Sequence, residues 1–264
     1  MSNPKPRTLT EEQILAFQLN GFLVVPDVLS PGEIVELSER CDLIASGKAE
    51  HIPERYIRLE TEFQNGRNLV ENQMLSVRKL FNIAVLDPVM WQHSVRETIV
   101  DIVADLLATD DIKMYGDQLF MKAAEVGSEQ PWHQDSASWR DIFPMDLVTA
   151  WTAIDNSSVQ NGCLNFAPGT HRWGMLNRDQ VGWFVDDLGS DQWPIVPVPL
   201  APGSISFHHS LVLHQSNANK SGKRRRGYAV HYMRATSRRD ENVTTAPKMP
   251  DFRQVRGRSF AERV

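Results

Sequence analysis

Residues 111–122 read Asp-Ile-Lys-Met-Tyr-Gly-Asp-Gln-Leu-Phe-Met-Lys, and here the sequence changes from a helical pattern to a strand-like one. The segments that follow are short, rich in β-branched and aromatic residues, and separated by turn residues such as Asn161-Gly162 and Pro168-Gly169. Many short strands after a helical start predict a β-sandwich or barrel with helices packed outside it. The strands are expected at residues 113–122, 147–155, 163–167, 204–207, 211–214 and 227–234.

Three helix starts are predicted before residue 111. Each has Ser or Thr followed three residues later by Glu or Gln, which is the spacing of a capping box. Apolar residues at helical spacing follow each start and predict a buried face. The starts are expected at 10–13, 30–33 and 94–97; the first helix ends at Gly21 before a short strand at 22–25, and the third runs to about Leu107.

The chain has 264 residues and is 41% hydrophobic, which suits one domain with a sizeable core. Its formal net charge of −5 gives no electrostatic reason to bind nucleic acid, and no apolar run approaches the length of a membrane span. Two cysteines and the lack of a signal-peptide pattern favour a reducing, cytoplasmic setting. We expect one domain over 1–264, with a helical N-terminal support over about 10–108, a β core over about 111–235 and a lid or substrate loop over about 174–200.

His133 and Asp135 stand two residues apart in the segment Pro131-Trp132-His133-Gln134-Asp135. If the backbone is extended there, both side chains leave the same face and can converge on one ion. A further histidine would complete the 2-His-1-carboxylate facial triad, which leaves one face of iron(II) open. The pair alone is a weak motif, because this spacing is common by chance. Candidates for the further histidine are His171, His208, His209, His214 and His231.

His214 is the favoured third ligand. It ends the apolar run Leu211-Val212-Leu213 and precedes a polar turn, and barrel sites are built where strands end beside loops. The basic run 220–226 comes next, followed by a strand. An arginine at the start of that strand could hold the far carboxylate of a bound dicarboxylic acid as a bidentate pair. We therefore expect one arginine of the run to turn inward and the rest to be solvated.

These segments, in this order and spacing, resemble the phytanoyl-CoA dioxygenase family of 2-oxoglutarate-dependent oxygenases. The resemblance covers most of the chain, from roughly Gln13 to His231. The matching segments are Gln118-Leu-Phe-Met-Lys122, Pro131-Trp-His-Gln-Asp135, Ala150-Trp-Thr-Ala-Ile-Asp155, Asn161-Gly-Cys-Leu164, Pro168-Gly-Thr-His171 and Leu213-His214 through Arg225.

The resemblance implies a mainly β fold with flanking helices (α+β), built on a cupin-like jelly roll, the double-stranded β-helix. It implies Fe(II), 2-oxoglutarate as cosubstrate and O2, and hydroxylation of an unactivated C–H bond of a small organic molecule with release of succinate and CO2. Related halogenases replace the metal carboxylate with a small residue, so Asp135 indicates a hydroxylase. The implied site residues are His133, Asp135 and His214 for iron, Arg225 and Ser216 for the far carboxylate of 2-oxoglutarate, and Trp151 and Gln118 in the wall of its pocket.

Two other functions stay open. Two histidines and an aspartate also suit zinc in a hydrolase or isomerase, although that function leaves Arg225 without a role. A non-catalytic homologue that binds a small molecule is the other alternative. The sequence does not identify the substrate, and it allows a monomer or a homodimer.

Six further residues have a role that the sequence leaves open between substrate contact and ordinary structure. Aromatic side chains beside the metal motif can wall a pocket or fill a core equally well. For a charged pair upstream, a surface salt bridge is the plainer account. The six are Trp132, Trp139, His171, Lys122, Arg58 and Glu60. His231 is expected to be an interior histidine with its hydrogen bonds satisfied.

Overall fold

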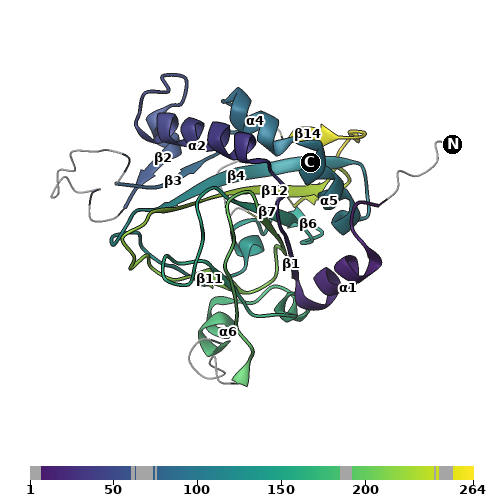
Figure 1. The fold of residues 1–264 in the computed structure, drawn as a ribbon. Helices are drawn as coiled ribbons and strands as arrows, with labels where there is room; N and C mark the ends of the chain where they lie inside the picture. The colour runs from purple at the N-terminus through teal and green to yellow at the C-terminus, as the bar shows by residue number, and fades with distance from the viewer. Residues whose placement is uncertain are drawn as a thin grey trace.

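Two antiparallel β-sheets lie face to face, and helices cover the outer face of the larger sheet (Figure 1). The computed structural model describes residues 7–60, 63, 74, 76–184, 192–240, 242–243 and 252–264. The fold class expected from the sequence, mainly β with flanking helices, is confirmed. Within the described ranges, no helix is long and apolar enough to cross a membrane. The helices are α1 (Glu11–Asn20), α2 (Pro31–Ala45), α4 (Pro88–Ser94), α5 (Glu97–Leu107) and α6 (Arg178–Trp183).

The larger sheet has the strand order β1-β10-β7-β12-β4-β3-β2, with β14 also paired to β4. The smaller sheet has the order β5-β11-β8-β9. Strands β6 and β13 pair with each other as a separate two-stranded sheet. The strands are β1 (Phe22–Val25), β2 (Ile57–Leu59), β3 (Val77–Phe81), β4 (Ile112–Lys122), β5 (Gln130–His133), β6 (Ile142–Phe143), β7 (Val148–Ala153), β8 (Leu164–Phe166), β9 (Val196–Val198), β10 (Ile205–His209), β11 (His214–Ser216), β12 (Arg225–Arg234), β13 (Arg238–Arg239) and β14 (Arg253–Arg256).

Strand β12 shows how the two faces of the larger sheet are used. Its residues Tyr228, Val230 and Tyr232 are buried in the cluster that also contains Ile99 of α5. Between them, Ala229 packs into a different cluster that includes residues of the smaller sheet. Because successive side chains of a strand point to opposite faces, the helices cover one face of the sheet. The other face is left to line the space between the sheets, where the candidate site lies.

One of the three predicted capping boxes is wrong. Thr10 and Ser30 cap α1 and α2 as expected, each with reciprocal bonds to the residue three positions later. Ser94, in contrast, is the last residue of α4, and its hydroxyl donates to the Met90 carbonyl at 2.9 Å. Helix α5 begins at Glu97 without a side-chain cap. The serine is therefore already bound within the preceding helix, which the sequence did not predict.

Two downstream predictions also differ from the structure. The strand expected at 211–214 lies instead at His214–Ser216, because Val212 and Leu213 are buried in the turn that leads into it. The region 174–200, expected to be irregular, contains α6 and β9. Residues 185–191 of the expected lid lie outside the described residues. That residues 174–200 act as a lid stays a prediction. That residues 1–264 form a single domain also stays a prediction.

Stability is expected to fall in mild acid because of His93. This side chain is buried and its Nε2 lies 3.1 Å from the Thr152 hydroxyl. Burial, followed by the charge of Arg96, lowers the pKa of His93 from 6.5 to about 3. As pH falls below 6.5 the unfolded chain takes up a proton that the folded chain cannot hold, so folding weakens until the pH reaches the folded pKa. This group alone should remove about 2 kcal/mol of stability between pH 8 and pH 5.

Chemical denaturation at the two pH values measures this effect. In His93→Gln, the difference in unfolding free energy between pH 8 and pH 5 should shrink by about 2 kcal/mol. An identical pH dependence in the variant and the unmodified protein would show that His93 is not responsible.

Candidate metal centre

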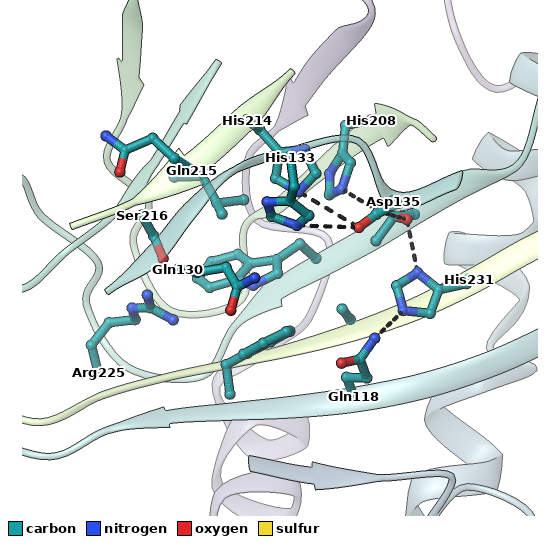
Figure 2. Close-up of a pocket in the computed structure, with 15 residues that line it drawn as sticks. Gln118, Gln130, His133, Asp135, His208, His214, Gln215, Ser216, Arg225 and His231 are labelled. Atoms are coloured by element: carbon teal, nitrogen blue, oxygen red, sulfur yellow. Dashed lines mark hydrogen bonds and ion pairs between the residues drawn. The ribbon is translucent and has the colours of Figure 1, made fainter. Parts of the chain in front are cut away.

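The metal motif is assembled by two neighbouring strands of the smaller sheet. His214, the first residue of β11, is the direct partner of His133, the last residue of β5, and their ring centroids lie 4.2 Å apart. Oδ1 of Asp135 lies 3.6 Å from Nε2 of His133 and 3.7 Å from Nε2 of His214. One ligand atom from each residue lies within 4.8 Å of the other two. The three side chains can therefore hold one metal ion (Figure 2).

Backbone hydrogen bonds set the orientation of both imidazoles. Nδ1 of His133 lies 2.8 Å from the Pro131 carbonyl, and Nδ1 of His214 lies 3.0 Å from the Val212 carbonyl. A carbonyl oxygen can only accept, so each Nδ1 carries a hydrogen, and Nε2 is the nitrogen left to bind a metal ion. Histidines that bind metals are usually oriented by such a bond from the other ring nitrogen. Both Nε2 atoms face Asp135.

Gln134 fixes the chain between the two halves of the motif. Its backbone is extended, with φ −109° and ψ 133°, so His133 and Asp135 leave the chain on the same side, as predicted. The chain then turns at once into a short 3-10 helix, which the sequence did not predict. The buried Gln134 amide donates to the carbonyls of Gly174 at 2.9 Å and Leu211 at 2.7 Å. These bonds anchor the motif to the loops around it.

The second carboxylate oxygen of Asp135 is held from the larger sheet. Oδ2 accepts a hydrogen bond from the Thr149 hydroxyl at 3.0 Å and lies 3.3 Å from Nε2 of His208. The Thr149 oxygen lies 2.8 Å from Nδ1 of His231, whose Nε2 lies 3.2 Å from the amide nitrogen of Gln118. An amide nitrogen only donates, so Nε2 of His231 accepts the bond from Gln118. The ring hydrogen of the neutral imidazole is then on Nδ1, which donates it to the Thr149 oxygen. Each group in this series therefore donates to the next, from Gln118 of β4 through His231 and Thr149 to the Asp135 carboxylate (Figure 2).

The charges of the motif are those that a cation site requires. Burial acts to raise the pKa of Asp135, but the neighbouring imidazoles of His214, His133 and His208 together hold it well below its usual range. Burial, followed by His133, lowers the pKa of His214 well below 6.5. Asp135 is thus ionised and His214 neutral at neutral pH, the protonation states in which these side chains bind metals.

Arg225, the first residue of β12, is buried and has no acidic partner among the residues that the structure describes. It is 1% exposed, and its Nη2 donates to the Gly162 carbonyl at 2.7 Å, whereas its Nε has no hydrogen-bond partner among the described residues. Burial lowers its pKa to about 10, so it stays charged at neutral pH. The Trp151 ring lies 5.3 Å from its Cζ. A buried cation without a counter-ion is costly, and this position therefore suits a bound anion.

The neighbouring arginines have other partners. Arg226 is 2% exposed and donates to both oxygens of Asp155, at 2.9 and 2.8 Å, and to Asp42 at 2.9 Å. Arg224 also binds Asp42. One arginine, Arg225, turns into the pocket as expected, but the expectation that the rest are solvated is wrong for Arg226, which is buried on the opposite face of the strand. Of these three, Arg225 is the one that lines the space between the sheets.

A pocket between the sheets joins the metal motif to Arg225. At Gly227, a Cβ would lie 1.8 Å from the Trp151 ring, so glycine allows the ring to lie against β12 beneath the guanidinium. Figure 2 shows Arg225 and Ser216 toward one end of the pocket and Gln118 toward the other. The seven site residues predicted from the sequence all line this pocket: His133, Asp135, His214, Arg225, Ser216, Trp151 and Gln118.

A family model described as phytanoyl-CoA dioxygenase (PhyH) matches residues 17–227, which is most of the chain. The chain belongs to the phytanoyl-CoA dioxygenase family. A Caenorhabditis elegans protein named probable phytanoyl-CoA dioxygenase is 26% identical over 245 residues, which cover 85% of this chain and 75% of the relative. The phytanoyl-CoA dioxygenase of Arabidopsis thaliana is 24% identical, with 92% of this chain and 96% of the relative covered.

Solved structures share the fold of this phytanoyl-CoA dioxygenase family member. EctD from S. alaskensis with 2-oxoglutarate and 5-hydroxyectoine has a TM-score of 0.78 and 23% identity, covering all of this chain and 89% of EctD. The non-haem α-ketoglutarate-dependent epimerase SnoN has a TM-score of 0.73 and 20% identity, covering 94% of this chain and 98% of SnoN. At these identities the likeness shows the fold, and the expected jelly roll is confirmed.

The sequence reasoning missed the hydrogen bonds behind the carboxylate in this family member. His231 is an interior histidine with both nitrogens bonded, as predicted, but its partner Thr149 was not singled out. A usable signal existed, because Thr149 precedes Trp151 by two residues and alternation puts both on one face of β7. His208 was considered as a rival of His214, and it contacts the motif through the other carboxylate oxygen.

Three of the six residues of open role do not line the metal pocket. Trp139 lines a second cavity beside the metal pocket. Trp132 packs in a hydrophobic cluster, with its ring 5.3 Å from that of Phe184. His171 lies outside the metal pocket, and its Nε2 is 3.1 Å from the Gln18 carbonyl, so it ties its turn to helix α1.

The structure also shows the surroundings of the three charged residues of open role. Lys122 is buried rather than solvated, and its Nζ donates to the Ser216 carbonyl at 3.0 Å. Burial lowers the pKa of Lys122 to about 6. The plainer of the two interpretations of Arg58 and Glu60, a surface salt bridge between them, is wrong. Glu60 is 2% exposed and accepts a bond from the Ser128 hydroxyl at 2.7 Å, whereas Arg58 lines the second cavity.

Proposed function

We propose that this chain is an Fe(II)- and 2-oxoglutarate-dependent dioxygenase that hydroxylates an unactivated C–H bond of a small organic molecule, with release of succinate and CO2. The observation that carries the proposal is one pocket with a His-Asp-His cluster in one wall and, in another, a buried guanidinium that has no acidic partner in the described part of the chain. Membership of the phytanoyl-CoA dioxygenase family supports the reaction class. EctD, which shares the fold, has been solved with Fe and with 2-oxoglutarate.

The donor groups of the pocket fit these cofactors. Two imidazole nitrogens and a carboxylate oxygen are the donors of the facial triad that binds iron(II) in oxygenases. The unpartnered Nε of Arg225 fits a carboxylate, since guanidinium groups bind carboxylates in bidentate pairs. When bound, iron(II) and 2-oxoglutarate together supply the oxidising chemistry that breaks a C–H bond with O2.

The protein residues hold, orient and shelter the reacting groups. In this proposal His133, Asp135 and His214 hold iron at the end of the pocket formed by β5 and β11. Arg225 and Ser216 bind the far carboxylate of 2-oxoglutarate and so fix its orientation relative to the metal motif. Trp151 and Gln118 complete the wall of the pocket.

Thr149→Val is expected to weaken iron(II) binding by about tenfold to a hundredfold, the usual cost of removing a group that orients a ligand. Valine keeps the shape of threonine but removes the bond to Oδ2 of Asp135 and leaves Nδ1 of His231 without its acceptor. Metal titration monitored by calorimetry measures the affinity. Thr149→Ser, which keeps the hydroxyl, should bind iron almost as the unmodified protein does, and an unchanged affinity in Thr149→Val would exclude this positioning role.

The reaction class is tested by incubating the purified protein with 2-oxoglutarate, O2 and a metal. We expect slow formation of succinate without a substrate, in the presence of iron(II) but not zinc(II), and faster formation with a substrate. Mass spectrometry should then detect a product heavier than the substrate by one oxygen atom. Zinc-dependent hydrolysis without consumption of 2-oxoglutarate would instead support the hydrolase alternative.

A further inference from the structure

A second cavity adjoins the metal pocket on the same face of the larger sheet. It has a volume of about 200 Å3 and shares Gln118 and His231 with the metal pocket. Strands β2 and β3 contribute Arg58 and Lys79 to its wall, and the segment after the metal motif contributes Trp139. An apolar cavity of roughly 150 Å3 holds benzene. The second cavity therefore has room for an organic molecule somewhat larger than an aromatic ring.

Two cations lie directly opposite each other in the wall of this cavity. Arg58 of β2 is the cross-strand partner of Lys79 of β3. Like charges at directly opposite positions destabilise a sheet. Burial, followed by the charges of Arg58 and Arg78, also lowers the pKa of the half-buried Lys79. The sheet thus carries an unfavourable charge pair here, which an anion bound between the two side chains would offset.

Within the described residues, no salt bridge joins a carboxylate to Arg58 or Lys79, although the charge of Asp135 acts against the lowering of the Lys79 pKa. Nζ of Lys79 donates to Oε1 of Gln118 at 3.0 Å, and the guanidinium of Arg58 lies 5.3 Å from the Phe81 ring centre. Among the described lining residues, Asp117 is the one with a carboxylate. Its oxygens accept hydrogen bonds from two backbone N–H groups, at 3.1 and 3.0 Å, and are therefore already bound.

The wall beyond the cations is aromatic. The rings of Trp139 and Tyr115 lie 4.7 Å apart, and Trp139 lies 4.5 Å from the ring of His231. Trp139 and Tyr115 are both largely buried, so they present a fixed apolar surface. Sites for small molecules combine such apolar walls with a few placed polar groups. This cavity therefore combines an apolar surface with a site for one negative charge.

The cations are also connected to the metal pocket. Lys79 donates a hydrogen bond to Gln118, and Gln118 in turn is bonded to His231. Gln118 and His231 are the two residues that line both cavities. A molecule whose acid group is bound at Arg58 and Lys79 would reach the metal motif past Gln118 and His231, which Figure 2 shows below Asp135.

Resting on the proposed function, we propose that the substrate is a small organic acid with an apolar or aromatic body. Arg58 and Lys79 bind the acid group, and Trp139 and Tyr115 pack against the body. The C–H bond that is hydroxylated lies on the part of the body remote from the acid group. The two cations select acids over neutral molecules of the same shape.

The test compares phenylacetate with phenylacetamide, and longer phenyl-substituted acids with their amides, because each pair has one shape and differs in charge. Calorimetry measures binding at millimolar concentration to anaerobic protein saturated with iron(II) and 2-oxoglutarate, so that Arg225 is already occupied. Visible absorption of the iron chelate is recorded on the same samples. We expect the acids to bind at least about tenfold more tightly than the amides.

Lys79→Gln and Arg58→Gln should each weaken binding of the acids by about tenfold and leave binding of the amides unchanged. Arg55→Gln is the matched control, because Arg55 lies outside the cavity and packs on Tyr56. It should leave binding of the acids unchanged. Since glutamine removes the repulsion between the two cations, neither cavity variant should have a lower thermal midpoint than the unmodified protein. If a variant with an unchanged or higher thermal midpoint binds the acids less tightly, the weaker binding is not caused by unfolding.

Equal binding of acids and amides, or no binding of any acid in the series, would overturn the proposal. So would acid selectivity that survives in the Arg58→Gln, Lys79→Gln double variant. The visible band distinguishes this failure from failure of the proposed function. A chelate band without acid selectivity contradicts the acid site alone, whereas acid-selective binding without a band contradicts the dioxygenase and leaves the acid site standing.

Discussion

Replacing His133 with alanine is expected to abolish iron(II) binding and consumption of 2-oxoglutarate together. His133 supplies one of the two imidazole nitrogens that face Oδ1 of Asp135. Without it, His214 and Asp135 offer two donors where the facial triad uses three. Removing a group that merely orients a ligand costs ten- to a hundredfold in metal affinity, so loss of the ligand itself should cost more than about a hundredfold. The iron content after loading and desalting, measured by elemental mass spectrometry, reports the loss.

His171→Ala is the control for this experiment. His171 lies outside the metal pocket and its Nε2 is near the Gln18 carbonyl, so its loss should leave the iron content unchanged. Circular dichroism and the thermal midpoint show whether each variant is folded. A folded His133→Ala variant that keeps iron as firmly as the unmodified protein would mean that the cluster is not the metal site.

Arg225→Gln is expected to raise the KM for 2-oxoglutarate by about a hundredfold or more, because two charge-assisted hydrogen bonds to the far carboxylate are lost. Glutamine removes the charge and keeps a polar amide, but it is shorter than arginine, so the bond from Nη2 to the Gly162 carbonyl is lost as well. A second consequence follows from the burial of Arg225 without an acidic partner. In the absence of 2-oxoglutarate the variant should be at least as stable as the unmodified protein, since a buried unpaired charge has been removed. Steady-state kinetics and thermal denaturation measure the two effects.

Arg224→Gln is the matched control, since Arg224 is the preceding residue and pairs with Asp42 outside the pocket. It should leave the KM for 2-oxoglutarate unchanged. An equal effect of the two substitutions would indicate a general electrostatic contribution, and no effect of Arg225→Gln would exclude the proposed cosubstrate site.

The parts of the site that the sequence predicted are those that depend on local geometry. His133 and Asp135 could be paired because side chains two residues apart in an extended chain point to the same side. The motifs in a fixed order added His214 and Arg225, which are far apart in the chain. Contacts that depend on strand register could not be predicted in this way. Thr149 and His231 meet only because β7 and β12 are neighbours and pair Thr149 directly with His231.

The errors had similar physical causes. Ser94 has the spacing of a cap, but α4 ends on it and already satisfies its hydroxyl. Arg226 was expected in solvent because a basic run is usually exposed, and its burial depends on Asp155 and Asp42, which come from distant segments. The opposition of Arg58 and Lys79 likewise depends on the register of β2 and β3, which no local pattern reveals.

An anaerobic titration of the protein with iron(II) and 2-oxoglutarate, followed by visible absorption, tests most directly whether one pocket holds both. We predict that a chelate band appears only when both are present, is missing in His133→Ala and is weakened in Arg225→Gln at the same concentrations. It should decay when O2 is admitted, as succinate forms. Protein that binds iron in equal amount but develops no band with 2-oxoglutarate would contradict the proposed function.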